Sequence, residues 1–336
     1  MTDKNLENPE VNSDEIQESL DAARVEAWKA YYALKSGAEL EAAEKAYAEE
    51  VAAEEEGKFR IPSPDWRTLK PGVRDSALYT ETSGIIDEDS DLTWWDGRNV
   101  SGVTIGLIQF RANVPMMPGN MGNATTFDFP MLYREMLPYS IVDVLAEEPT
   151  ANFTEAIVDA ARWLELQGVS AIMGNCGFFG SYQNTVQARI NTPFFSSSLM
   201  QLPMIVQSMP RDKKVAVITA NGPRLSIVPA IEACGLSAED KANRIVVRGL
   251  ENAPEFVAAV SNTGKYNAAR VEAEIIETTK LVMQEHDIGA VLLECTELSP
   301  HAVGVQNAVR MPVWDYTTLT KWIYSGTVRR PFVGHI

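Results

Sequence analysis

Short apolar runs rich in β-branched residues recur from residue 103 onward, and longer stretches with helical spacing separate them. Apolar runs of about four to eight residues are typical of buried strands. Such runs occur within residues 103–110, 169–176, 192–201, 214–223, 244–250, 288–295 and 311–319. The stretches between them, such as 153–168 and 268–286, predict amphipathic helices. Because strands and helices alternate, the pattern predicts an α/β fold with mainly parallel sheets and right-handed crossovers.

Two of these runs match each other position by position. Val169–Cys176 reads VSAIMGNC and Ile288–Cys295 reads IGAVLLEC, so each begins with a β-branched residue and ends in Cys. Open α/β sheets bind ligands at the carboxyl ends of their strands. The match therefore predicts two pseudo-symmetric lobes, each contributing one thiol to an active site between them. We assign residues 102–200 with 303–330 to the first lobe and residues 201–302 to the second.

An acidic segment precedes the predicted α/β body. Residues 1–57 hold 16 acidic and 5 basic side chains, so −11 of the formal charge of −17 lies there. Apolar residues in this segment follow two helical stripes and predict an N-terminal helical hairpin. We favour a solvated extension, while Trp28 with Tyr31 and Tyr32 suggests a dimerisation arm. Residues 58–101, with scattered prolines, form a linker or a strap.

Composition excludes several classes of protein. The chain has 29 Lys and Arg against 46 Asp and Glu, so nothing supplies the basic surface that nucleic acid binding needs. Three cysteines without close spacing argue against a disulfide framework, and with three scattered histidines we expect no metal site. No apolar run approaches the roughly 18–20 residues that span a membrane. The amino terminus does not resemble a secretory signal, so we expect a cytoplasmic protein.

Cys176 and Cys295 are the candidate catalytic residues. Each precedes a predicted helix start, and a helix amino terminus lowers the pKa of a thiol, so we expect partial thiolate character. One thiolate can remove a proton next to a carboxylate while the opposite thiol returns one, without a cofactor. The carbanion then needs hydrogen-bond donors at the substrate carboxylate. The candidates for these contacts are Asn175, Gly177, Ser197, Ser198, Asn221 and Thr296.

Structural roles compete with this interpretation. A cysteine at the end of a buried strand is usually a small buried hydrophobe, but two in matched contexts favour a function. We assign Cys234, inside a predicted helix, to the core. Glu294 and Glu297 flank Cys295 and either orient a thiol or a substrate amine, or, for Glu297, cap a helix. A structural role is the expectation for His301.

The two cysteine motifs resemble those of a known family. GNCGFF (174–179) and LLECTELSP (292–300) are similar to the catalytic motifs of the aspartate/glutamate/hydantoin racemase superfamily. The resemblance covers roughly residues 100–330 and implies two pseudo-symmetric α/β lobes around the active site, often in a dimer. It also implies that Cys176 and Cys295 are the acid/base pair. The carboxylate contacts that it implies are Asn175, Gly177 and Thr296.

The resemblance does not fix the reaction. The superfamily includes amino-acid racemases, hydantoin racemase, maleate isomerase, arylmalonate decarboxylase and algal dimethylsulfoniopropionate lyases. Decarboxylases of this type keep only one of the two cysteines, so the presence of both counts against that reaction. The stretches 118–136 and 312–318 are more similar to the lyase-like branch than to glutamate racemases.

Three hypotheses about function therefore stand. The first is a racemase acting on a small carboxylate substrate, without a cofactor, as a homo-oligomer of two or more chains. The second is a lyase in which one cysteine removes the α-proton and a β leaving group departs, as with dimethylsulfoniopropionate. The long loop 111–130 supports it, because a bulky cationic leaving group needs an aromatic or acidic lining. The candidates for this lining are Phe127, Asp128, Phe129 and Tyr133. The third is a two-lobed small-molecule binding protein that keeps the cysteines by chance.

Overall fold

The computed structural model describes residues 102–112, 114, 116–140, 144, 151–261 and 266–329. The predicted helical hairpin at 1–57 and the linker or strap at 58–101 lie outside the described residues.

The first sheet has four parallel strands in the order β2-β1-β3-β4. Its strands are β1 (Ile105–Arg111), β2 (Met131–Ser140), β3 (Ala171–Gly174) and β4 (Phe194–Phe195). The helical segments of this half are α5 (Ala151–Leu166), η2 (Gly177–Tyr182), α6 (Gln183–Gln187), η3 (Ser198–Gln201) and α7 (Leu202–Ser208). β2 was not predicted from the sequence, and it is an edge strand that contains Pro138. Proline cannot donate to the hydrogen-bond ladder, and an edge strand tolerates this because it has a partner strand on one side only.

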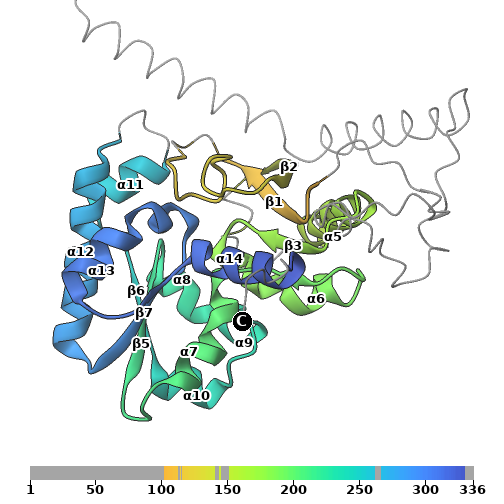
Figure 1. Cartoon of the computed structure of the whole chain (residues 1–336). Helices are drawn as coiled ribbons and strands as arrows, with labels where there is room; N and C mark the ends of the chain where they lie inside the picture. Colours follow the sequence, from red (N-terminus) through yellow and green to blue (C-terminus); the bar gives the residue numbers. More distant parts are fainter. Residues whose placement is uncertain are drawn as a thin grey trace, which may run out of the picture. The chain divides into compact units, whose positions relative to one another are not determined.

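The second sheet repeats the first, with the strand order β6-β5-β7-β8, again all parallel. Its strands are β5 (Lys214–Thr219), β6 (Ile245–Gly249), β7 (Ile288–Leu293) and β8 (Val313–Trp314). Its first helices are α8 (Gly222–Ile227), α9 (Ala230–Ala233), α10 (Ala238–Arg244) and α11 (Pro254–Val260). They are followed by α12 (Ala268–Glu285), η4 (Thr296–His301), α13 (Ala302–Val309) and α14 (Tyr316–Thr327). Figure 1 shows α12 and α13 along one side of this sheet.

The identical strand orders confirm the predicted α/β fold with two parallel sheets. Counted along the chain, the strands of each sheet lie in the order second, first, third, fourth. The two cysteine runs are the third strands, β3 and β7, so they occupy equivalent places in the two sheets.

Apolar faces of the helices bury both sheets. α5 packs against the first sheet through Phe153, Ile157 and Leu164, none of which is exposed. Gly106 in β1 makes room for this helix, because a Cβ there would lie 2.8 Å from Leu164 Cδ2. α14 joins the same half, since Tyr316 and Leu319 share a core cluster with β1 and β3.

The boundary between the two halves differs from the predicted one. β8 pairs with β7 in the second sheet, whereas we assigned residues 303–330 to the first lobe. The chain returns to the first half at Asp315, where α14 begins with a capping box formed with Thr318. Gln201 ties this start to the first half by donating to Asp315 O at 2.9 Å.

Gly174, at the end of β3, offers a test of how tightly this strand is packed. A Cβ there would lie 2.5 Å from Ser196 O and 2.7 Å from Phe179 Cδ2. We expect Gly174→Ala to lower the free energy of unfolding by about 1–3 kcal/mol through overpacking. Urea unfolding measures this change.

Gly326 in α14 is the matched control, because a Cβ there meets nothing within 4 Å. Gly326→Ala is expected to raise stability by up to about 1 kcal/mol through helix propensity. Equal unfolding free energies for the two alanine variants would contradict this account of the packing.

Candidate active site

The two matched cysteines end equivalent strands and begin equivalent turns. Cys176 follows β3 and is the N-cap of η2, while Cys295 follows β7 and is the N-cap of η4. Both thiols are free and buried. They are close enough that the charge of Cys176 contributes to raising the pKa of Cys295. The fold therefore brings one thiol from each sheet to a shared boundary.

Glu294 of the second half is packed against Gly177 of the first. A Cβ on Gly177 would overlap the Glu294 carboxyl group, 1.6 Å from Oε1, so only glycine permits this approach. Glu294 is fully buried, and its Oε2 accepts a hydrogen bond from Thr219 Oγ1 at 2.7 Å. Its Oε1 has no hydrogen-bond partner among the described residues. Burial raises the pKa of Glu294 to about 7, so this carboxyl group can hold or release a proton near neutrality.

Cys295 has its own carboxylate neighbour. Its Sγ donates to Glu297 Oε2 at 2.9 Å, which makes Glu297 a direct acceptor for the thiol proton. Burial raises the pKa of Glu297, while hydrogen bonds from Cys295 and from Asn120, in the loop before β2, act in the opposite direction. Thr296 Oγ1 holds the same loop by accepting from Met121 N at 3.0 Å. The long loop therefore reaches the candidate active site through Asn120 and Met121.

The expected partial thiolate character is wrong for this structure. The pKa values of Cys176 and Cys295 are both raised well above the ordinary value for a thiol, chiefly by burial. The negative charges of Glu294 and Glu297 raise both pKa values further. Backbone N–H groups of Phe178 and Phe179 act on Cys176 in the opposite direction, but burial outweighs them. A neighbouring carboxylate is the acceptor that this site offers to the thiol proton.

The other predicted contacts fall into two groups. Asn175 is buried beside Cys176, and its Oδ1 has no partner within the described part of the chain. Ser197 Oγ accepts from Leu199 N and caps η3. Ser198 Oγ donates to Glu294 O at 2.9 Å, and Asn221 Oδ1 caps α8 by accepting from Arg224 N. Ser198 and Asn221 are thus engaged in structural hydrogen bonds.

Cys234 and His301 are both buried. Cys234 ends α9 in the hydrophobic core, as expected, with its Sγ 3.8 Å from Ser196 Oγ. His301 is buried between Tyr266 and Glu272, with both ring nitrogens in hydrogen bonds. Tyr316 was not predicted as a site residue, and its side chain is fully buried. Burial raises the pKa of Tyr316, and the charges of Cys176 and Glu294 raise it further. Its position two residues after the end of β8 was the available signal.

A hollow opens beside Glu297, and its walls are mainly apolar and aromatic. The residues around it are Val114, Met117, Asn120, Phe256, Ala259, Val260, Tyr266, Val271, Glu297 and Pro300. The aromatic residues predicted to line a cation site lie elsewhere. Phe129 stacks on Tyr324 with ring centroids 3.7 Å apart and on Phe127 at 5.0 Å, in the core beneath α14.

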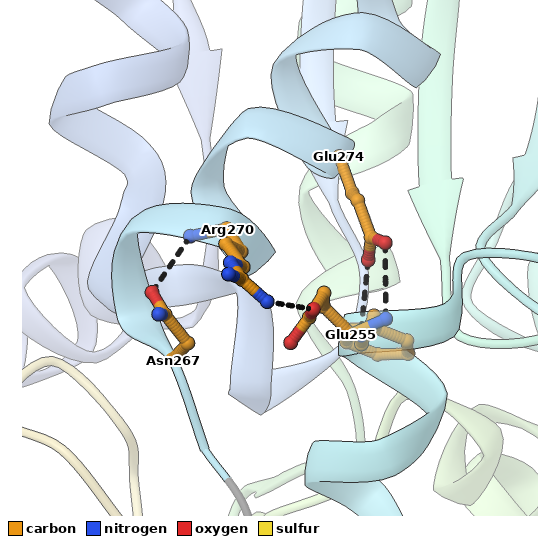
Figure 2. A network of polar contacts seen from close by, with 5 residues as sticks. Glu255, Asn267, Arg270 and Glu274 are labelled. Carbon is orange, nitrogen blue, oxygen red and sulfur yellow. Dashed lines mark hydrogen bonds and ion pairs between the residues drawn. The ribbon is translucent and has the colours of Figure 1, made fainter.

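A polar network fixes the wall of the hollow that α11 and α12 provide (Figure 2). The Glu274 carboxylate accepts from Glu255 N at 3.0 Å and from Phe256 N at 2.8 Å, and so caps the start of α11. Arg270 Nη1 donates to Glu255 Oε1 at 2.9 Å, and Asn267 Oδ1 caps α12 at Arg270 N. The network therefore holds Phe256 and the start of α12, next to Tyr266, in place.

No group of three or more His, Cys, Asp or Glu side chains in the described ranges could hold a metal ion. No helix among these residues is long and apolar enough to cross a membrane. The cytoplasmic location, the small carboxylate partner and the homo-oligomer stay predictions.

The fold and the site together define a class of protein: two repeated α/β halves, each ending its third strand in a cysteine at a common boundary. No family model matches the chain. The chain is 30% identical over 238 residues to dimethylsulfoniopropionate lyase 3 of Emiliania huxleyi (strain CCMP1516), covering 69% of this chain and 61% of that protein. It is 27% identical over 240 residues to the dimethylsulfoniopropionate lyase of Durusdinium sp. clade D, covering 70% and 79% respectively. The chain thus spans less than two thirds of the Emiliania lyase.

Two solved structures are similar to the chain at low sequence identity. Arylmalonate decarboxylase matches with a TM-score of 0.43 and 17% identity over 69% of this chain and 97% of that one. A glutamate racemase isoform from Bacillus anthracis matches with a TM-score of 0.44 and 11% identity over 68% and 85%. The resemblance predicted from the two cysteine motifs, with its proximity to the lyase branch, is confirmed by the similarity to the dimethylsulfoniopropionate lyases.

The Cys295–Glu297 pair predicts how the reactivity of this thiol depends on pH. Glu297→Gln removes a negative charge that raises the pKa of Cys295, so alkylation by iodoacetamide should begin at a lower pH. Mass spectrometry of the three cysteines across a pH series measures this change. Cys234 is the internal control, because burial raises its pKa to about 12 and Glu297 does not contribute. An unchanged or upward-shifted profile for Cys295 would contradict the assignment.

Proposed function

We propose that the chain is a cofactor-independent lyase. It removes the proton α to the carboxylate of a small substrate and eliminates a cationic β leaving group, and dimethylsulfoniopropionate is the first substrate to test. The lyases among its sequence relatives support this choice of reaction. The observation that carries the proposal is the hydrogen bond from Cys295 Sγ to Glu297 Oε2 at 2.9 Å.

Cys295 with Glu297 is the proposed base. The carboxylate takes the thiol proton, and the resulting thiolate is positioned to accept a proton from carbon. The two groups share one proton and titrate as a pair, so burial disfavours their simultaneous ionisation. The Cys176 thiol has the charge of Glu294 and backbone N–H groups nearby, whereas Cys295 donates a hydrogen bond to its carboxylate neighbour. Because the two thiols have such different neighbours, the site favours a reaction in which one thiol removes a proton over a racemisation in which the two thiols exchange roles.

The proposed elimination conserves atoms and electrons. The Cys295 thiolate takes the proton from C2 of dimethylsulfoniopropionate, and the electron pair of that C–H bond forms the C2–C3 double bond. The C3–S bond breaks, and its electron pair leaves with dimethyl sulfide. The products are acrylate, dimethyl sulfide and one proton held by the enzyme.

The hollow beside Glu297 suits the cationic end of such a substrate. Phe256, Tyr266 and Glu297 line it, and the Cys295–Glu297 pair carries one negative charge when it shares one proton. A sulfonium group over an aromatic face gains the attraction that quaternary ammonium ligands gain in aromatic cages. The carboxylate end then falls toward Asn175, whose side chain is buried beside Cys176 and whose Nδ2 amide group is the donor that a carboxylate can accept from.

Racemisation is the second candidate, and the presence of both cysteines at equivalent strand ends favours it. An elimination needs one base, whereas inversion at a carbon needs a base and an acid on opposite faces. The superfamily's racemases work in this way, and Cys176 is the acid or base that such a reaction would add.

Proton NMR in D2O separates the two candidates. Dimethylsulfoniopropionate should give vinyl protons of acrylate together with dimethyl sulfide, while both enantiomers of aspartate and glutamate, a hydantoin and maleate stay unchanged. Cys295→Ser should slow this elimination by at least about 100-fold, the usual scale for loss of a general base. Cys234→Ser, the same change in the core, is the matched control and should retain activity.

Exchange of an α-proton for deuterium without new products, from both enantiomers of one amino acid, would contradict the lyase and establish a racemase. Loss of that exchange in both Cys176→Ser and Cys295→Ser would then assign the pair. Elimination that survives Cys295→Ser would contradict the proposed base.

A further inference from the structure

A lyase of this kind must discharge one proton in every turnover. In a racemase the proton taken by one thiol is matched by a proton given by the other, but an elimination returns none to its products. The proton taken by Cys295 must therefore reach solvent before the next cycle. Cys295 is buried, with only 8% of its surface exposed, so direct release from the thiol is hindered.

A chain of hydrogen bonds leads from the wall of the hollow toward solvent. Tyr266 Oη lies 3.2 Å from His301 Nε2, and His301 Nδ1 lies 3.3 Å from Glu272 Oε2. His301 itself is only 2% exposed, whereas the Glu272 side chain is 39% exposed. The three residues thus connect a buried imidazole to a carboxylate at the surface.

The chemistry of these groups sets the direction of each hydrogen bond. A carboxylate only accepts, so His301 Nδ1 carries the proton that faces Glu272. Nε2 is then free to accept from the Tyr266 hydroxyl. An imidazole bonded in this way can take a proton at one nitrogen and release another at the other. Burial lowers the pKa of His301, which favours the neutral ring that such a relay needs.

Glu297 and Tyr266 meet at the hollow that both residues line. Asn120 lines it as well, so the space has three polar groups for a bridging water, within the range that ordered waters use. The charge of Glu297 contributes to raising the pKa of Tyr266, which places the two side chains near one another. The hollow therefore links the base pair to the first member of the chain.

Gly304 in α13 keeps the outer end of the chain in place. A Cβ on this glycine would lie 2.4 Å from both Glu272 Cδ and Glu272 Oε1. The carboxylate rests against the helix backbone only because no side chain is present there.

We infer that Tyr266, His301 and Glu272 carry the abstracted proton from the Cys295–Glu297 pair to solvent. The inference rests on the proposed lyase function. After each elimination Cys295 and Glu297 are both protonated, and the proton that Glu297 took from the thiol passes across the hollow to Tyr266, whose own proton moves to His301 Nε2. The proton on His301 Nδ1 passes to Glu272, which exchanges it with solvent. Tyr266, His301 and Glu272 act as positioning and relay residues and do not touch the reacting carbon.

Chemical rescue tests the inference. We expect Tyr266→Phe and Glu272→Gln to lower kcat for dimethylsulfoniopropionate elimination about tenfold or more in weakly buffered solution. Imidazole added at constant pH and ionic strength should restore the rate, because a diffusible base replaces the relay. Gly304→Ala, which displaces Glu272 without removing a titratable group, should show the same restorable loss. Tyr324→Phe and Glu277→Gln are the controls, because neither residue belongs to this series of hydrogen bonds. Their kcat values should match that of the wild type.

Unchanged rates in the relay variants would overturn the inference, and so would a loss that imidazole does not restore, since that result indicates a structural role. In both cases wild-type elimination would still stand. Absence of elimination by the wild type would remove the proposed function and the inference together, so the two failures are distinguishable.

Discussion

The candidate active site depends on a buried carboxyl group lying against a glycine. Glu294 extends from the end of β7 and contacts Gly177, directly after the cysteine of the other half. A carboxylate without full hydrogen bonding is costly to bury, and Thr219 satisfies only one of its oxygens. The structure accommodates this cost by raising the pKa of Glu294 to about 7. The same kind of burial also raises the pKa values of both thiols.

Unequal surroundings distinguish the two cysteines, although the fold places them equivalently. The repeated strand order gives each half one cysteine at the same position. Local sequence then separates them: after Cys295 comes Thr296-Glu297, whereas after Cys176 come Gly177 and two phenylalanines. One thiol therefore faces a carboxylate and the other faces backbone N–H groups. Duplication of a fold can thus supply a pair of thiols, while single substitutions beside them decide what each thiol does.

The sequence was sufficient to predict what local patterns control. The strands, the internal repeat and the pair Cys176 and Cys295 all follow from short apolar runs and their endings. β2 was not predicted because its sequence contains polar residues and Pro138 and therefore lacks the apolar run of a buried strand. The direction of the thiol pKa values was mispredicted because helix position is local, whereas burial and the approach of Glu294 depend on the assembled fold. The residues that line the hollow could not be predicted from the sequence for the same reason, since Phe256 and Tyr266 come from α11 and from the start of α12.

A crystal structure of Cys295→Ser with bound dimethylsulfoniopropionate tests the central claim most directly. The account predicts that C2 of the substrate lies against the side chain at position 295, with the sulfonium group in the hollow between Phe256 and Tyr266. It also predicts that the carboxylate lies on the side of Asn175. A substrate bound with C2 nearer to Cys176, or with its sulfonium group outside the hollow, would contradict the assignment of Cys295 and Glu297 as the base.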